Sequence, residues 1–168
     1  MARIDVPIQL RWNDLDAYGH VNNAAMLVLL EEARIAAFWS HPETADTRRA
    51  DAPPTAVLDA GPHSDLATLV ARNEIEYLRP LSYRRAPVHV VLWVGHLGGA
   101  SLDVCYELQD VPADAAAADG AAAEVYVRAT TTVVLVDAAT GSPRRIGDRE
   151  RAAWEPYVEE PVQLRRRR

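Results

Sequence analysis

Apolar and polar residues alternate at the start of the chain, where Ile4, Val6, Ile8 and Leu10 are separated by polar residues or by proline. An alternation with a period of two is typical of a strand that buries one face. Pro7 cannot donate a hydrogen bond within a sheet, so we expect this strand at an edge or near a bulge. Four further segments, rich in alternating or β-branched apolar residues, predict strands over 66–78, 88–94, 102–108 and 125–136.

The segment between the first two predicted strands has the composition of a helix from about Asn23 to Trp39. Its residues are mostly good helix formers, and neither glycine nor proline interrupts them. Because the first half is apolar almost all round, we expect this helix to be buried and not to lie on a surface. The asparagines at its start are preferred capping residues.

The order of these elements predicts an α+β fold, because one strand and one long helix precede four strands that hairpins join. We expect an antiparallel sheet wrapped around the helix, not the strand–helix alternation of a doubly wound fold. Residues 40–65 form a long proline-containing connection with a short element near 56–59. One helix cannot cover a long sheet completely, so an edge strand and part of a sheet face would stay exposed. A second copy of the chain would cover both, and we therefore expect at least a dimer.

The chain is expected to form a single domain over residues 1–147. Within it, the alanine-rich stretch 111–123 is low in complexity and predicts a mobile hairpin insert. Residues 148–154 predict a short helix with Asp148 near its start and Pro156 just past its end. An arginine-rich tail then runs to residue 168, which we interpret as solvated.

Composition narrows the class of protein. Among 168 residues, 49% are apolar, and the single cysteine excludes an intrachain disulfide, which fits a reducing compartment. The net charge of −6 is poorly suited to nucleic acid. No stretch approaches the roughly 18 continuous apolar residues of a membrane helix, and the first ten residues do not read as a signal peptide. We therefore expect a cytoplasmic protein without a metal or cofactor.

The turn between the first strand and the helix carries the candidate chemistry. Asp14 and Asp16 lie in this turn, and Gly19 permits a sharp bend or the close approach of a ligand. A helix start presents unpaired N–H groups and a partial positive charge. A carboxylate beside such donors suits acyl transfer, because the donors stabilise an oxyanion while the carboxylate attacks or activates water. Aspartates in such turns also serve as caps or turn formers, and the residues alone leave both interpretations open.

The motif around these aspartates has a recognisable form. The segment 11–34 contains Asp-x-Asp-x-x-Gly-His-Val-Asn-Asn followed by a helix with Glu-Glu-Ala-Arg, and 74–81 reads Glu-Ile-Glu-Tyr-Leu-Arg-Pro-Leu. These segments resemble the 4-hydroxybenzoyl-CoA thioesterase-like branch of the hotdog superfamily. The resemblance spans roughly residues 4–137 and leaves the alanine-rich insert unmatched.

The resemblance implies a hotdog fold, in which a five-stranded antiparallel sheet wraps around one long central helix, in homodimers or homotetramers with active sites at the subunit interface. It implies that Asp16 is the catalytic carboxylate and that a backbone N–H near Asn23 stabilises the oxyanion. Where many members have an aromatic residue just inside the helix, this chain has Ala24-Ala25-Met26, which we interpret as a change of pocket shape.

We therefore predict hydrolysis of an acyl-CoA thioester, with acyl-carrier-protein thioesters as an open alternative. The predicted catalytic group is Asp16, His20 and Asn23, and the predicted substrate-binding residues are Gly19, Val21, Asn22, Arg79, Arg84 and Arg85. A non-catalytic hotdog module that binds acyl-CoA is the alternative from another class. A hotdog dehydratase normally needs a histidine paired with a carboxylate across the interface. It ranks lower, because His20 lies close to Asp16 in sequence.

Other reactive side chains favour structural roles. Glu31 and Arg34 are three residues apart on the helix and predict an ion pair, whereas Glu32 has no such partner. Cys105 lies between apolar residues of a strand and predicts a packed thiol. The histidines at 89 and 96 have no spacing that suggests a metal site. The aromatic residues at 77 and 93 are expected in the core, with pocket lining as the alternative.

Overall fold

A computed structural model of the chain describes residues 2–40, 53–59, 64–112 and 123–165. The elements in chain order are β1 (Ile4–Ile8), η1 (Trp12–Asp14), α1 (Asn23–Phe38), β2 (Trp39–Ser40), β3 (Leu58–Asp59), β4 (Leu66–Tyr77), β5 (Val88–Leu97), β6 (Ser101–Gln109), β7 (Val125–Asp137), α3 (Asp148–Trp154) and η3 (Glu155–Tyr157). The predicted strands, the predicted helix at 23–39 and the short helix at 148–154 are confirmed within one to three residues at their ends.

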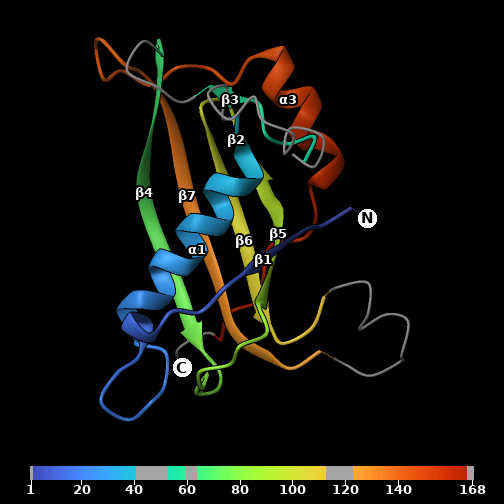
Figure 1. The fold of residues 1–168 in the computed structure, drawn as a ribbon. Coiled ribbons are helices and arrows are strands. Elements are labelled where there is room, and N and C mark those ends of the chain that lie inside the picture. The colour runs from blue at the N-terminus through green and yellow to red at the C-terminus, as the bar shows by residue number, and fades with distance from the viewer. Residues whose placement is uncertain (1, 41–52, 60–63, 113–122, 166–168) are drawn as a thin grey trace, which may run out of the picture.

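The main sheet has five antiparallel strands in the order β1-β5-β6-β7-β4, which confirms the α+β class (Figure 1). Strand β1 lies at an edge, as Pro7 predicts. Hairpins join β5 to β6 and β6 to β7, but β4 pairs with β7 and not with β5. The prediction that hairpins join all four strands was therefore wrong for β4. The two longest strands pair along nearly their whole length, from Leu66 opposite Asp137 to Tyr77 opposite Val127, and this leaves β4 as the second edge.

Helix α1 lies across one face of this sheet (Figure 1). Its 16 residues span about 24 Å, whereas the 13 residues of β7 span about 44 Å. The prediction of one long central helix is therefore corrected: the helix is short and covers only part of the sheet. It ends at Phe38 because Trp39 and Ser40 leave it to pair in parallel with Leu58 and Asp59 of β3.

Only one side of α1 is buried in the single chain. Side chains on that side pack against the sheet in one continuous core, and those of α1 are Met26, Leu29, Leu30, Ala33, Ala37 and Phe38. On the other side, Leu27 and Val28 are 37% and 42% exposed. The expectation that the helix is buried and does not lie on a surface is therefore wrong for one side of the helix in the single chain, because the sheet covers only the other side.

Helix α3 closes the core at the far end of α1. Trp154 is fully buried and packs edge-on against Phe38, with 5.8 Å between ring centroids. Its indole N–H donates to the carbonyl of Thr55 at 3.0 Å, which ties the connection after α1 to α3. The short element expected near 56–59 is present as β3.

The segment after η3 crosses the opposite face of the sheet. The Glu159 N–H donates to the Val94 carbonyl at 3.0 Å, and the Trp93 indole N–H donates to the Glu160 carbonyl at 3.0 Å. Farther along, the Val162 N–H donates to the Cys105 sulfur at 3.4 Å. Cys105 is buried, as predicted, and burial raises the pKa of its thiol.

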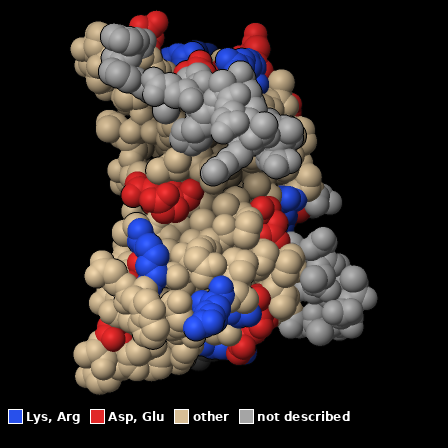
Figure 2. Space-filling model, viewed as in Figure 1, with Lys and Arg blue, Asp and Glu red and all other residues tan. Residues whose placement is uncertain are grey.

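Part of the sequence-based interpretation lies outside the described residues. This applies to 41–52 and 60–63 of the predicted connection, to 113–122 of the predicted insert and to 166–168 of the arginine-rich tail. No helix in the described ranges is both long and apolar enough to cross a membrane. On the face seen in Figure 2, the described basic side chains lie singly or in small groups interspersed with acidic ones.

Candidate functional site

A hollow of about 400 Å³ lies where α1 begins. We call it the Asp16 hollow, and its lining residues come from the turn before α1, the first turns of α1 and the end of β4 with the loop after it: Asp16, His20, Val21, Asn23, Met26, Tyr77, Leu78, Arg79, Pro80 and Leu81. Two segments about 60 residues apart in sequence are joined here, because the Val21 N–H donates to the Leu81 carbonyl at 2.7 Å.

The backbone of the turn holds the Asp16 carboxylate in place. One oxygen, Oδ1, accepts hydrogen bonds from the N–H groups of Tyr18 at 2.8 Å and His20 at 3.0 Å. The Asp16 N–H donates to the His20 carbonyl at 2.7 Å. Gly19 has a φ of 79°, a conformation that glycine adopts without steric cost. The second oxygen, Oδ2, accepts no hydrogen bond from a described residue, so it is available to a substrate or to water.

Asp14 has a different position and role. Its side chain is only 3% exposed, and its Oδ2 accepts from the Arg11 N–H at 2.7 Å while its Oδ1 accepts from the Arg11 guanidinium at 2.9 Å. Burial acts to raise the pKa of Asp14, but these hydrogen bonds and the guanidinium charge hold the pKa below its usual value. Asp14 does not line the hollow, and its hydrogen bonds hold the turn.

Asp14→Asn should lower the free energy of unfolding at pH 7 by about 1.5–3 kcal/mol, the usual contribution of a hydrogen bond to a charged group. Because the folded-state pKa is depressed, the stabilisation is present above the unfolded-state pKa and is lost as pH falls through the folded-state pKa. The difference between wild type and Asp14→Asn should therefore shrink below about pH 4. Urea unfolding from pH 7 to pH 2.5 measures it, and a pH-independent difference would contradict this role.

The start of α1 supplies the donors of the Asp16 hollow. Asn22 is the N-cap, and its Oδ1 accepts from the Ala24 N–H at 2.8 Å. The N–H of Asn23, the first helical residue, meets no acceptor among the described residues. The Asn23 carbonyl accepts from the Tyr77 hydroxyl at 2.7 Å, which fastens the helix start to the end of β4. The hollow thus holds a carboxylate oxygen and an unused N–H at the positive end of a helix.

The structure brings five of the predicted site residues together in this hollow: Asp16, His20, Val21, Asn23 and Arg79. The other four predicted residues, Gly19, Asn22, Arg84 and Arg85, do not line it. Arg79 is also paired with Glu124, whose pKa this ion pair lowers.

Tyr77 is the lining residue that the sequence interpretation underrated, because aromatic residues in strands are usually core. Its hydroxyl is bound to the helix start, and its side chain is 44% exposed. Tyr77 is the last residue of β4, next to a loop, and this position at a strand end could have indicated pocket lining. Trp93, in contrast, is buried in the sheet as expected.

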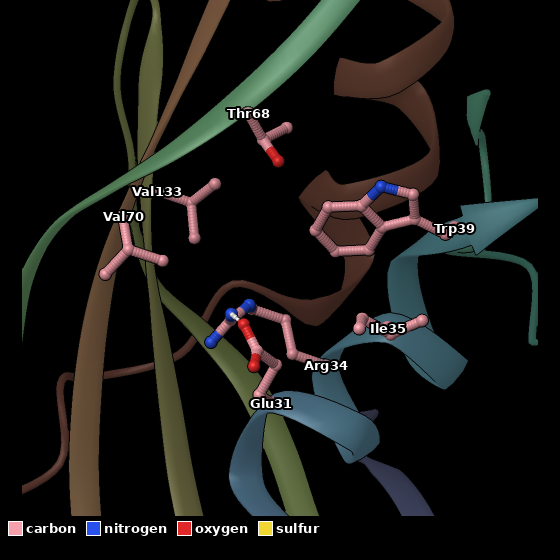
Figure 3. Close-up of a pocket in the computed structure, with 7 residues that line it drawn as sticks. All are labelled: Glu31, Arg34, Ile35, Trp39, Thr68, Val70 and Val133. Atoms are coloured by element: carbon pink, nitrogen blue, oxygen red, sulfur yellow. Dashed lines mark hydrogen bonds and ion pairs between the residues drawn. The ribbon is translucent and has the colours of Figure 1, made fainter. Parts of the chain in front are cut away.

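A second hollow, of about 330 Å³, lies between the later turns of α1 and strands β4 and β7 (Figure 3). We call it the Arg34 hollow, and its lining residues are Glu31, Arg34, Ile35, Trp39, Thr68, Val70 and Val133. The Arg34 guanidinium donates to the Tyr106 hydroxyl and to Glu31, both at 3.2 Å, which confirms the predicted ion pair. The buried Nε of Arg34 has no partner among the described residues.

The two hollows differ in the chemistry that their residues allow. The carboxylate of the Arg34 hollow, Glu31, already forms an ion pair with Arg34. It also lies two turns away from the start of α1, where the unpaired N–H groups of the helix are. The Asp16 hollow combines a carboxylate oxygen without a partner and an unused helix N–H. We therefore assign the candidate chemistry to the Asp16 hollow. Across the described ranges, no group of three or more His, Cys, Asp or Glu side chains could hold a metal ion.

A family model covers most of the chain. The family model of the thioesterase-like superfamily matches residues 10–162, which cover both the Asp16 turn and the end of β4. The chain belongs to the thioesterase-like superfamily. No curated protein sequence matches it.

Solved structures match nearly the whole chain. YbaW of Escherichia coli, assigned as a thioesterase, is 25% identical, with a TM-score of 0.62 over 92% of this chain and 98% of its own. An assigned acyl-CoA thioesterase of Xanthomonas campestris is 26% identical, with a TM-score of 0.57 over 85% and 98%. A 1,4-dihydroxy-2-naphthoyl-CoA thioesterase of Synechocystis is 16% identical, with a TM-score of 0.63 over 90% and 95%, and shows the fold alone. The fold is of the hotdog type, and the family supports thioester hydrolysis in general.

Proposed function

We propose that this protein hydrolyses acyl-CoA thioesters to the free acid and CoA at the Asp16 hollow. The observation that carries the proposal is the meeting of the Asp16 carboxylate and the start of α1 in one hollow. The substrate class named for one structural neighbour, an acyl-CoA, is a CoA thioester and supports the choice of CoA.

The chemistry follows from these two groups. The thioester carbonyl oxygen would lie against the Asn23 N–H, where the helix dipole favours the negative charge that develops as the carbonyl carbon is attacked. The free Oδ2 of Asp16 either attacks that carbon, forming an anhydride that water then cleaves, or removes a proton from an attacking water. In both routes CoA leaves as a thiolate and takes up a proton, and the acyl group gains a hydroxyl from water.

The remaining predicted residues have supporting roles in this proposal. His20 and Gly19 hold the turn that orients Asp16, and Asn22 fixes the helix start by capping it. Val21 gives the hollow an apolar wall beside the thioester. Arg79, Arg84 and Arg85 follow β4 and are proposed to attract the phosphate groups of CoA.

We also propose that the active unit is a homodimer or homotetramer in the cytoplasm. Strand β4 is an edge strand whose Leu69 and Val70 are 55% and 46% exposed. On α1, Leu27 and Val28 are also exposed. Unpaired edges and exposed apolar side chains of this kind are commonly covered by a second subunit. The molecular mass measured by sedimentation equilibrium tests the assembly, and a monomer across micromolar concentrations would contradict it.

Thiol release from a panel of acyl-CoAs tests the proposed function. The panel should contain short, long and aromatic acyl groups, and purified protein should release one thiol per acid formed from at least one of them. The alternative, a non-catalytic module, would bind acyl-CoA in equilibrium dialysis and release no thiol. A dehydratase would change the acyl chain and leave the thioester intact, which mass spectrometry of the product distinguishes.

A further inference from the structure

An exposed aromatic pair lies beside the Asp16 hollow. Trp12, in η1, stacks on Tyr83 with 4.4 Å between ring centroids and an angle of 16° between ring planes. Tyr83 is half-buried and packs against the core, so it supports the indole from below. Trp12 itself is 74% exposed. A tryptophan this exposed is uncommon, and its second ring face is open to a flat partner.

The aromatic pair is connected directly to the candidate site. Trp12 precedes Asp16 by four residues, so their Cα atoms are at most about 14 Å apart. Tyr83 follows Leu81, which lines the Asp16 hollow, by two residues. A backbone bridge between His20 and Ser82 fixes the two segments against each other. The aromatic pair and the Asp16 hollow therefore share two chain segments, 12–21 and 81–83.

Positive charge adjoins this platform. Arg84 and Arg85 directly follow Tyr83, and neither forms an ion pair with another residue in the part of the chain that the structure describes. Arg79, by contrast, is bound by Glu124. A flat aromatic face, next in sequence to two arginines that form no ion pair among the described residues, matches a ligand that carries both an aromatic ring and phosphates.

We propose that Trp12 stacks on the adenine ring of CoA while Arg84 and Arg85 pair with its phosphates. This inference rests on the proposed thioester hydrolysis and deepens it, because it selects CoA over an acyl carrier protein. The phosphopantetheine arm of a carrier protein ends in a serine phosphodiester and has no purine to stack. Base stacking on aromatic side chains makes a substantial and sequence-tolerant contribution to binding.

Two substrates with the same acyl group test the platform: the acyl-CoA and the acyl-pantetheine, which lacks the adenine nucleotide. For wild type, the ratio of kcat/KM on acyl-CoA to kcat/KM on acyl-pantetheine should be well above one. In Trp12→Ala this ratio should fall about 5- to 150-fold, the range expected for one lost stacking contact. Trp12→Phe should restore most of the ratio, and the loss should appear mainly in KM.

Tyr18→Ala is the matched control, because Tyr18 is 85% exposed between Trp12 and the helix start but stacks on no aromatic ring of the described residues. It should leave the ratio unchanged. An unchanged ratio in Trp12→Ala, or an equal fall in Tyr18→Ala, would overturn the inference and leave the proposed hydrolysis standing. If Trp12→Ala has a lower molecular mass in sedimentation than wild type and an unchanged kcat/KM ratio, the inference is also overturned. Trp12 would then be assigned to a contact between subunits. If wild type cleaves neither substrate nor any acyl-CoA of the panel, the proposed function itself fails.

Discussion

Asp16→Asn should lower kcat for acyl-CoA hydrolysis by about 10²- to 10⁴-fold, the usual contribution of a positioned acid–base group. The change is nearly isosteric, and the amide oxygen of asparagine can still accept the N–H groups of Tyr18 and His20 that now bind Asp16 Oδ1. The turn should therefore remain, and only the negative charge at Oδ2 is lost. Steady-state kinetics with unfolding curves of both proteins measure the effect.

The chain offers a matched control for this substitution. Asp137 caps a similar turn, where its Oδ1 accepts the Thr140 N–H at 2.7 Å and the Ala139 N–H at 3.1 Å, and Gly141 has a φ of 69°. The Thr140 hydroxyl also donates to this Oδ1 at 2.8 Å, and that hydrogen bond, together with the two N–H bonds, lowers the pKa of Asp137. It lies opposite Leu66, at the other end of β4 from the Asp16 hollow and about 36 Å away along that strand. Asp137→Asn should leave kcat unchanged, whereas an equal loss in both variants would point to a general effect on the fold.

The second large effect concerns the backbone donor. Replacing Asn23 with proline removes the N–H that the proposal places against the thioester oxygen. Proline is tolerated at the first position of a helix, and Asn22 already has the extended φ of −60° and ψ of 139° that a residue before proline adopts. The loss of one oxyanion donor typically lowers kcat about 10²- to 10³-fold, and we expect a fall in this range with little change in helix stability.

Asn23→Ala separates the side chain from the backbone in the same experiment. Alanine removes the carboxamide and keeps the N–H, so its kcat should lie within a few-fold of wild type. Circular dichroism and the unfolding midpoint check that the proline variant keeps α1. If Asn23→Ala loses as much activity as Asn23→Pro, the side chain and not the backbone is the functional group at this position.

The sheet and the turn chemistry were predictable from sequence because both depend on local spacing. Period-two alternation located the five strands, and the absence of glycine and proline located α1. The position of β4 was not predictable, because alternation says which residues share a face but not which strand is the neighbour. The buried side of α1 was also not predictable in detail, since its first half is apolar on sides that the sheet does not reach, as Leu27 and Val28 show.

The candidate site also has a part that was predictable from the sequence and a part that was not. Asp16, His20 and Asn23 are close in sequence, so one turn and one helix start were enough to predict their proximity. Tyr77 and Arg79 join them only because β4 ends at the start of α1, which depends on the strand order. The Trp12–Tyr83 stack joins residues 71 positions apart, and no local pattern indicates it.

The central claim is that the Asp16 carboxylate, facing the start of α1, hydrolyses a thioester. Its most direct measurement is the initial rate of CoA thiol release from the best acyl-CoA of the panel by wild type, Asp16→Asn and Asp137→Asn side by side. We predict release by wild type and Asp137→Asn at similar rates, and a rate at least about 100-fold lower for Asp16→Asn. Equal release by wild type and Asp16→Asn would contradict the claim.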